Sequence, residues 1–308
     1  MQRAVYLRML KLVMGALALH APLALLWSAP ARADENFFGY VKGAETLPKG
    51  TYELYEILTY RGDKGEGTYR AYDSDTELEY GITNRLTGSV SLKAQSVETK
   101  GLLIDAYIPK DHDAGLDLSG IEAAVKYNFL SPAKDDIGLA GYFAIDYGWL
   151  DPHSGQDKTT VSFDTMMLAQ KYFLDDQLVW VGNLGLESTI ADRDPIANLP
   201  AGFEWPTDPE MEIEFTAGTG VNYRFAPRWF AGGEIYYQQE RETGVDVERW
   251  SVQAGPNLHY GSSNWWATLT WLPQLRGGGT DYAGQQDTNL HLIEKTKQEV
   301  RIKMGYNF

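Results

Sequence analysis

The chain ends in the stretch QEVRIKMGYNF, residues 298–308, in which polar and apolar side chains alternate strictly. Successive side chains of a strand point to opposite faces, so this stretch has one apolar face and one polar face. The apolar face carries Val300, Ile302, Met304, Tyr306 and Phe308. The polar face carries Glu299, Arg301, Lys303, Gly305 and Asn307. The pattern predicts a strand with one face in an apolar environment.

The same alternation recurs upstream and predicts about twelve strands of roughly ten residues or more. We place them at about 51–61, 69–82, 86–98, 119–130, 137–149, 160–174, 178–191, 211–225, 229–241, 249–261, 265–275 and 299–308. Short connections alternate with long polar ones, which are residues 62–68, 99–118, 150–159, 192–210, 242–248 and 276–298. An even strand number and loops sorted by end predict an all-β fold, a transmembrane antiparallel up-and-down β-barrel. With both termini on the periplasmic side, all the long loops lie outside the cell.

Composition narrows the function. The chain of 308 residues has no cysteine, which excludes disulfides, thiolate metal sites and a cysteine nucleophile. Its 27 Lys and Arg against 42 Asp and Glu give a net charge of −15, which argues against nucleic acid as a partner. We expect no cofactor.

The first residues have the layout of a secretory signal peptide. Arg3, Arg8 and Lys11 precede an apolar run, and the small-residue triplet of residues 31–33 follows it. We therefore predict cleavage before Asp34, with a signal peptide at 1–33 and the barrel at 34–308.

The terminal stretch KMGYNF resembles the C-terminal signal of Gram-negative outer-membrane β-barrels. In that class the signal, here Tyr306 and Phe308, is recognised by the barrel-insertion machinery, which the resemblance implies as a partner together with outer-membrane lipid. The stretches KGAETLPKG, TYELYE, GITNRLTG and GPNLHYGSSNWWATLTWLP are similar to uncharacterised exported barrels and to transporter-like barrels associated with aromatic-compound degradation. The resemblance implies an outer-membrane location and a porin-like fold, and brings no catalytic residues.

The polar parity of the strands would line the lumen. These candidates are Asp73, Asp75, Glu77, Glu79, Lys93, Glu122, Lys126, Asp146, Asp164, Glu187, Glu212, Glu214, Arg224, Glu234, His259, Glu299, Arg301 and Lys303. They either pair across strands to fill the barrel or select a permeating solute. The excess of acids favours cations or neutral solutes.

Two residues depart from the pattern. Glu56 shares the lipid-facing parity of its strand, which requires either a β-bulge or a hydrogen-bonding neighbour. Pro256 removes a ladder donor from the tenth strand, so we expect a distortion there.

The leading hypothesis is a passive channel for small solutes, apolar or aromatic in character. The alternative is a non-conducting surface barrel whose acidic loops bind a partner or a cation. Asp111 to Asp117 would then be a candidate calcium-binding loop. An outer-membrane lipase or protease ranks third, because a Ser-His arrangement on one face is not found in the pattern. We predict no enzyme, and no catalytic, cofactor-binding or metal-binding residue.

Overall fold

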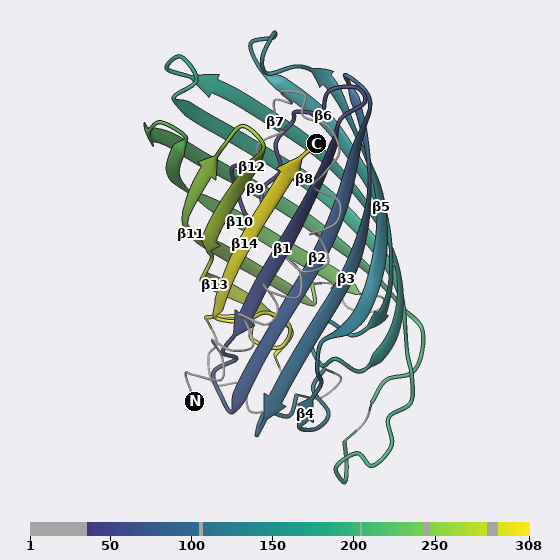
Figure 1. Cartoon of the computed structure of the whole chain (residues 1–308). Helices are drawn as coiled ribbons and strands as arrows, with labels where there is room; N and C mark the ends of the chain where they lie inside the picture. Colours follow the sequence, from purple (N-terminus) through teal and green to yellow (C-terminus); the bar gives the residue numbers. More distant parts are fainter. Residues whose placement is uncertain (1–35, 105–106, 204, 243–246, 282–288) are drawn as a thin grey trace.

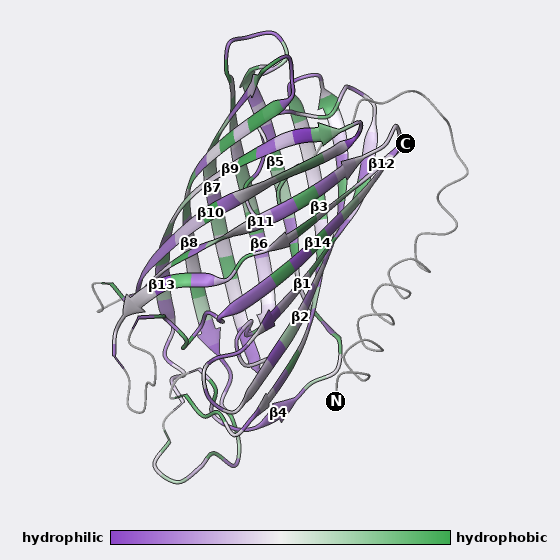
Figure 2. Cartoon of the chain, turned by 90° about the vertical axis from the view of Figure 1, so that its left-hand side faces the viewer, coloured by the Kyte–Doolittle hydropathy of each residue, from purple (hydrophilic) through white to green (hydrophobic). Residues whose placement is uncertain are grey.

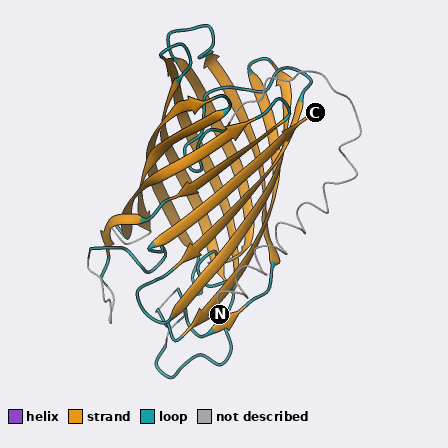
Figure 3. Cartoon of the chain, turned by 60° about the vertical axis from the view of Figure 1, so that its left-hand side comes forward, coloured by secondary structure: helices purple, strands orange, loops and turns teal. Residues whose placement is uncertain are grey.

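The computed structural model describes residues 36–104, 107–203, 205–242, 247–281 and 289–308, and within them every regular element is a strand (Figure 3). No helix among these residues is long and apolar enough to cross a membrane. The predicted signal peptide at 1–33 lies outside the described residues.

The strands tilt around a closed wall (Figure 1). They are β1 (Tyr52–Gly62), β2 (Thr68–Thr83), β3 (Leu86–Lys100), β4 (His112–Asp113), β5 (Asp117–Leu130), β6 (Gly138–Leu150), β7 (Asp157–Phe173), β8 (Leu178–Arg193), β9 (Glu210–Ala226), β10 (Trp229–Glu242), β11 (Arg249–Gly261), β12 (Trp265–Trp271), β13 (Gln274–Gly279) and β14 (Gln298–Asn307). All pairings are antiparallel, and β14 closes the barrel by pairing with β1 in the register Leu54↔Tyr306. The predicted fold class is confirmed.

The fourteen strands fill twelve places around the barrel wall. The two-residue β4 pairs only with the end of β3, and β12 and β13 together occupy the wall between β11 and β14. The break between β12 and β13 falls at Leu272 and Pro273, where the predicted strand 265–275 was continuous. Proline has no N–H for the ladder, and here only the carbonyl of Pro273 bonds to β11, accepting the Ala254 N–H at 3.2 Å.

The distortion expected at Pro256 lies a few residues before it in β11, between Val252 and Gln253. Pairing of β11 with β10 runs unbroken through Gly233↔Pro256. On the other side of β11 the register shifts between Val252 and Gln253, next to the gap between β12 and β13.

The outer wall carries the apolar parity of the strands, seen as alternating bands along them (Figure 2). Predicted outward residues that are exposed include Ile121, Val125, Tyr127, Phe129, Ile213, Phe215, Val221, Tyr223 and Phe225. An apolar surface of this extent matches a lipid-facing barrel wall.

Glu56 lies on this outer wall and is only 5% exposed. The β1–β2 register runs without a bulge through Glu56↔Thr76. Its two carboxylate oxygens accept hydrogen bonds from Ser74 Oγ at 2.5 Å and Thr76 Oγ1 at 2.6 Å. Of the two explanations, the hydrogen-bonding neighbour is correct.

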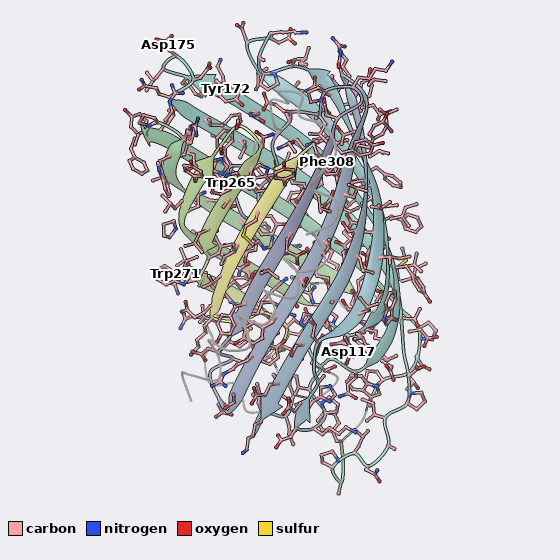
Figure 4. All side chains as sticks on the ribbon, in the orientation of Figure 1. Asp117, Tyr172, Asp175, Trp265, Trp271 and Phe308 are labelled. Carbon is pink, nitrogen blue, oxygen red and sulfur yellow. The ribbon has the colours of Figure 1, made fainter. Side chains whose placement is uncertain are left out.

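The two ends of the barrel differ. Short turns and the C-terminus lie at one end, marked by Asp175 and Phe308, whereas Asp117 lies toward the end with the long connections (Figure 4). In the turn between β7 and β8, Leu174, Asp175 and Asp176 have φ of 55°, 53° and 61°. These left-handed conformations let the chain reverse direction tightly between the two strands. We call these the short-turn end and the long-loop end.

Candidate functional site

The inside of the barrel is crossed by the chain's own N-terminal portion. Residues 36–48, the lumen segment, precede β1, and Phe37, Phe38, Val41 and Leu47 within it are buried. Polar side chains of the inner wall bond to its backbone at distances of 2.6–3.1 Å. The contributing residues are Glu234, Asn183, Gln170, Asn128, Thr87, Asn222, Thr268 and Arg301.

Amide side chains suit this task because each offers both a donor and an acceptor. Asn183 accepts the Lys42 N–H at 2.6 Å and donates to the Lys42 carbonyl at 2.8 Å. Gln170 accepts the Ala44 N–H at 2.8 Å, and Asn128 donates to the Ala44 carbonyl at 2.6 Å. The wall thus replaces the sheet partners that an isolated extended segment lacks.

Apolar side chains anchor the start of the lumen segment. Phe37, Phe38 and Val41 form a buried cluster with residues of β8 and β10, including Phe230, whose ring centroid lies 4.9 Å from that of Phe37. Gly220 of β9 makes room for this cluster, since a Cβ there would lie 2.5 Å from Phe38 Cε1. The close approach explains a glycine within a strand.

The long-loop end is narrowed by residues 289–297, the inner loop between β13 and β14. Lys64 Nζ donates to the carbonyls of Leu292 at 3.3 Å, Ile293 at 2.5 Å and Lys295 at 3.0 Å. Gln274 Nε2 donates to the His291 carbonyl at 2.9 Å. The lumen segment and the inner loop therefore both border the open space inside the barrel.

Two histidines at this end are held neutral. Burial, followed by the charges of Arg249 and Lys64, lowers the pKa of His291 to about 2. Burial, followed by Lys64 and Arg249, also lowers the pKa of His153 well below its usual value. Both side chains belong to loops that cover the lumen.

The interior contains a cavity of about 610 Å³. Twelve carboxylates line it: Asp73, Asp75, Glu77, Glu122, Asp146, Asp164, Glu187, Glu212, Glu214, Glu240, Glu294 and Glu299. Seven Lys and Arg side chains line it: Lys42, Arg61, Lys93, Lys158, Arg249, Lys295 and Arg301. Ten of the twelve acids, together with Lys93 and Arg301, are predicted lumen residues. The lining is charged, mixed in sign and acidic in balance.

Many of these charges pair across strands. Lys93 Nζ lies 2.8 Å from Glu122 Oε2 and also bonds to Asp146. Arg61 holds Asp73 through two hydrogen bonds of 2.7 and 2.8 Å. Such pairing is the structural alternative that the sequence left open, and here it accounts for part of the lining.

Arg249 forms the largest cluster. It pairs with Glu214 at 3.4 Å and also with Glu240 and Glu294. Glu240, Glu294 and Glu248 bring carboxylate oxygens within 4.8 Å of one another, as a metal site does. Because a guanidinium already neutralises two of them, we assign this group to loop closure.

Six of the predicted lumen residues do not line the cavity. Glu234, His259 and Lys303 instead contact the lumen segment: His259 lies against the Phe37 ring at 4.8 Å, and Lys303 Nζ donates to Asn36 Oδ1 at 3.4 Å. The other three are placed elsewhere on the strands: Glu79 beside Tyr55, Arg224 donating to the Asp175 carbonyl at 3.5 Å, and Lys126 opposite Thr87.

The acidic stretch Asp111 to Asp117 does not gather around one point. Asp111 Oδ1 accepts the Gly101 N–H at 2.7 Å, while Asp113 pairs in β4 and Asp117 begins β5. Of these acids, Asp111 thus accepts a backbone hydrogen bond near its own loop.

Tyr40 and Lys42 also reach the cavity, from the lumen segment, and were not among the predicted lumen residues. The Tyr40 hydroxyl donates to Glu299 at 2.7 Å, and Lys42 Nζ lies 4.6 Å from the Tyr142 ring centroid. Burial, and then Glu299, raises the pKa of Tyr40 well above its usual value, so the hydroxyl remains a donor. The available signal was the apolar pair Phe37 and Phe38, placed between the predicted cleavage point and the first strand.

Solved structures share this architecture. An outer-membrane channel from Pseudomonas putida F1 superposes with a TM-score of 0.57 at 13% identity, covering 86% of this chain and 98% of that one. The NanC porin gives a TM-score of 0.47 at 10% identity, covering 82% and 98%. The KdgM porin, in complex with disordered oligogalacturonate, gives 0.43 at 11% identity, covering 84% and 99%. The first of these shows that the fold is that of an outer-membrane barrel.

A search of curated proteins finds no match to this sequence. The family model of DUF6662, a family of unknown function, matches residues 30–308. Because this family model matches nearly the whole chain, the protein belongs to the DUF6662 family.

Proposed function

We propose that the protein is an outer-membrane channel that passes a small solute, aromatic in character, through its lumen. The observation that carries the proposal is the charged cavity of about 610 Å³ enclosed by the barrel wall. A barrel whose only task is anchorage needs no such space. The apolar outer wall supports the membrane location, with the short-turn end in the periplasm.

The balance of the lining supports a selectivity. Twelve carboxylates stand against seven Lys and Arg side chains, so the cavity favours cations and disfavours simple anions. Tyr40, Tyr142 and Tyr236 also line it and offer aromatic faces to a solute. Solute size is limited by the lumen segment at one end and by the inner loop at the other.

The histidines support a non-enzymatic role. His259 Nδ1 bonds to Thr268 Oγ1 at 2.7 Å, the arrangement nearest to an activated hydroxyl. His259 and Thr268 are 0% and 1% exposed, beneath the lumen segment, where no lipid or protein substrate can reach them. Nucleophilic catalysis needs that access.

One observation favours a second function. The lumen segment is held by eight wall side chains, which suits a barrel that does not conduct and presents its loops to a partner. Under that function the cavity would be a packing defect between two obstructions.

Planar-bilayer recording of the refolded chain separates the two functions. We expect discrete current steps whose reversal potential under a salt gradient shows a preference for cations. Liposome swelling with small aromatic solutes should follow. Barrels that insert, with folded spectra, yet give neither current nor swelling would support the surface-barrel function and contradict the channel.

A further inference from the structure

The buried amide side chains of the inner wall fall into two groups. Gln170, Asn183 and Asn128 are 2%, 3% and 3% exposed, and each hydrogen-bonds the backbone of the lumen segment at 2.6–2.8 Å. Gln253 and Asn257 of β11 are buried to the same degree, at 2% and 5%. Within the described residues, however, Gln253 Nε2 and both Asn257 amide atoms, Oδ1 and Nδ2, have no hydrogen-bond partner. The two groups therefore differ in their partners and not in their burial.

Ser251 belongs with the second group. It is 1% exposed, and its Oγ also has no partner among the residues that the structure describes. Alternate residues of β11 point inward, so Ser251 shares one face with Gln253 and Asn257. The remaining position between Gln253 and Asn257 on this face is Gly255, which adds no side chain to the row. We call Ser251, Gln253 and Asn257 the β11 strip.

The β11 strip leads from the cavity toward the short-turn end. Gln253 lines the cavity, and Asn257 lies further along β11, which ends at Gly261 before the short connection to β12. The strand between these two residues spans about 13 Å. Glu234, whose carboxylate anchors the lumen segment, is the register partner of Gly255, between Gln253 and Asn257. The strip therefore has residues on both sides of the level at which the lumen segment is anchored.

Buried polar atoms without partners are unfavourable and rare in native proteins. A row of them on one strand points to partners that the chain itself does not supply, and groups in the lumen are within reach. The chemistry of the row selects those groups. Gln253 Nε2 and Asn257 Nδ2 donate hydrogen bonds, Asn257 Oδ1 accepts them, and the Ser251 hydroxyl does both. A hydroxyl group or a water molecule complements all of these atoms, whereas an ammonium only donates and a carboxylate only accepts.

We propose that the solute passes between the lumen segment and β11, where Ser251, Gln253 and Asn257 exchange hydrogen bonds with its hydroxyl groups and its hydration water. The solute class is a small neutral molecule that carries hydroxyl groups. The inference rests on the proposed function, because it names the route and the solute chemistry of the same lumen. It assigns selectivity past the lumen segment to the β11 strip.

The test uses single cysteine variants, because the chain has no cysteine of its own. Two thiol-reactive probes of equal length differ only in their last group: 2-hydroxyethyl methanethiosulfonate ends in a hydroxyl, and propyl methanethiosulfonate ends in a methyl. Mass spectrometry follows the modification of Gln253→Cys and Asn257→Cys in the full refolded barrel in detergent. We expect the hydroxyethyl probe to react at least fivefold faster than the propyl probe at both positions, after normalisation to their rates at the exposed Lys100→Cys.

Gln170→Cys is the matched control, since Gln170 has the residue type and the 2% exposure of Gln253 but is bonded to the lumen segment. We expect its modification to be at least tenfold slower than that of Gln253→Cys with either probe. Heat-modifiable gel mobility verifies folding, and chymotrypsin resistance of residues 36–48 verifies that the lumen segment stays in place in each variant. Equal rates at Gln170→Cys and Gln253→Cys, or faster reaction of the propyl probe at Gln253→Cys, would overturn the proposal.

Planar-bilayer recording separates the failure of this route from the failure of the channel. Modification of Gln253→Cys with the hydroxyethyl probe should lower the single-channel conductance by at least a third, whereas modification of Lys100→Cys should leave it unchanged. A barrel that conducts while Gln253→Cys stays unreactive contradicts the β11 route and leaves the channel standing. A silent barrel in which Gln253→Cys reacts with the hydroxyl preference contradicts the channel and keeps the β11 strip as a hydroxyl-binding surface.

Discussion

Glu234 Oε1 accepts the backbone N–H of Gly39 at 2.8 Å, joining the middle of β10 to a residue 195 positions earlier in the chain. The same carboxylate accepts the N–H groups of Tyr40 at 2.8 Å and Val41 at 3.1 Å through Oε2. A carboxylate bonded to consecutive backbone donors is a strong local anchor. The lumen segment is therefore fixed at the point where it enters the cavity.

Replacement of this anchor should loosen the lumen segment. We expect Glu234→Ala to expose the aromatic residues 37, 38 and 40 to chymotrypsin, with cleavage before β1 at least tenfold faster than in the parent chain, because three backbone donors lose their acceptor. Glu98→Gln, at the far end of β3, is the control. Unchanged proteolysis in a folded Glu234→Ala barrel would show that the apolar cluster alone holds the segment.

Movement of the lumen segment is testable because the chain has no cysteine. A Cβ on Gly39 would lie 2.8 Å from Thr270 Cβ, close enough for Gly39→Cys and Thr270→Cys to be bridged after a small adjustment. We expect oxidation of this pair to lower conductance severalfold and reductant to restore it. Each single cysteine variant is the control, and current insensitive to oxidation would mean that solutes pass beside a fixed segment.

The pairing of Lys93 should influence ion selectivity. Lys93→Met leaves Glu122 and Asp146 without their shared cation, so we expect the reversal potential under a salt gradient to shift toward stronger cation preference. Lys100→Met, at the exposed end of the same strand, removes the same charge away from the cavity and should leave selectivity unchanged. A shift of equal size in both variants would assign the effect to net charge alone.

Acid should open the long-loop end. The folded loops keep His291 neutral, with a pKa of about 2, whereas an opened loop protonates it near pH 6.5. Its contribution to loop closure is therefore complete above about pH 6.5 and is lost as the pH falls below that value, by about 2 kcal/mol at pH 5. His153, whose pKa is also lowered, acts in the same direction.

Hydrogen exchange of residues 289–297 measures this opening. After correction for the intrinsic pH dependence, we expect faster exchange at pH 5 than at pH 7 in the parent chain, and a smaller difference in His291→Asn. Peptides from β7 serve as the internal reference. Identical corrected rates at both pH values would remove His291 from loop closure.

The Glu56 carboxylate on the outer wall should stabilise the barrel by accepting hydrogen bonds from Ser74 and Thr76. Glu56→Leu leaves the hydroxyls of Ser74 and Thr76 without their acceptor in an apolar surrounding, at a cost of about 1–2 kcal/mol in the free energy of unfolding. The triple variant Glu56→Leu, Ser74→Ala, Thr76→Val removes all three polar groups and should recover most of that loss. Urea unfolding in lipid vesicles compares them, and a triple variant no more stable than the single one would contradict the reasoning.

The sequence by itself determined the wall. Side chains of a strand alternate between faces with a period of two, so the stretch from Val300 to Phe308 already assigns its residues to lipid or lumen. Loop lengths read along the chain likewise separated the two ends of the barrel. The one wall strand misjudged was 265–275, where Pro273 breaks the ladder.

Only the tertiary structure decided what fills the barrel. The lumen segment has no regular pattern of its own, and its backbone is held by side chains such as Asn183, which lies 141 residues away in sequence. Closure of twelve wall positions around one axis brings those side chains together. A period of two specifies which face a residue occupies, whereas the residue across the lumen depends on how the whole sheet closes.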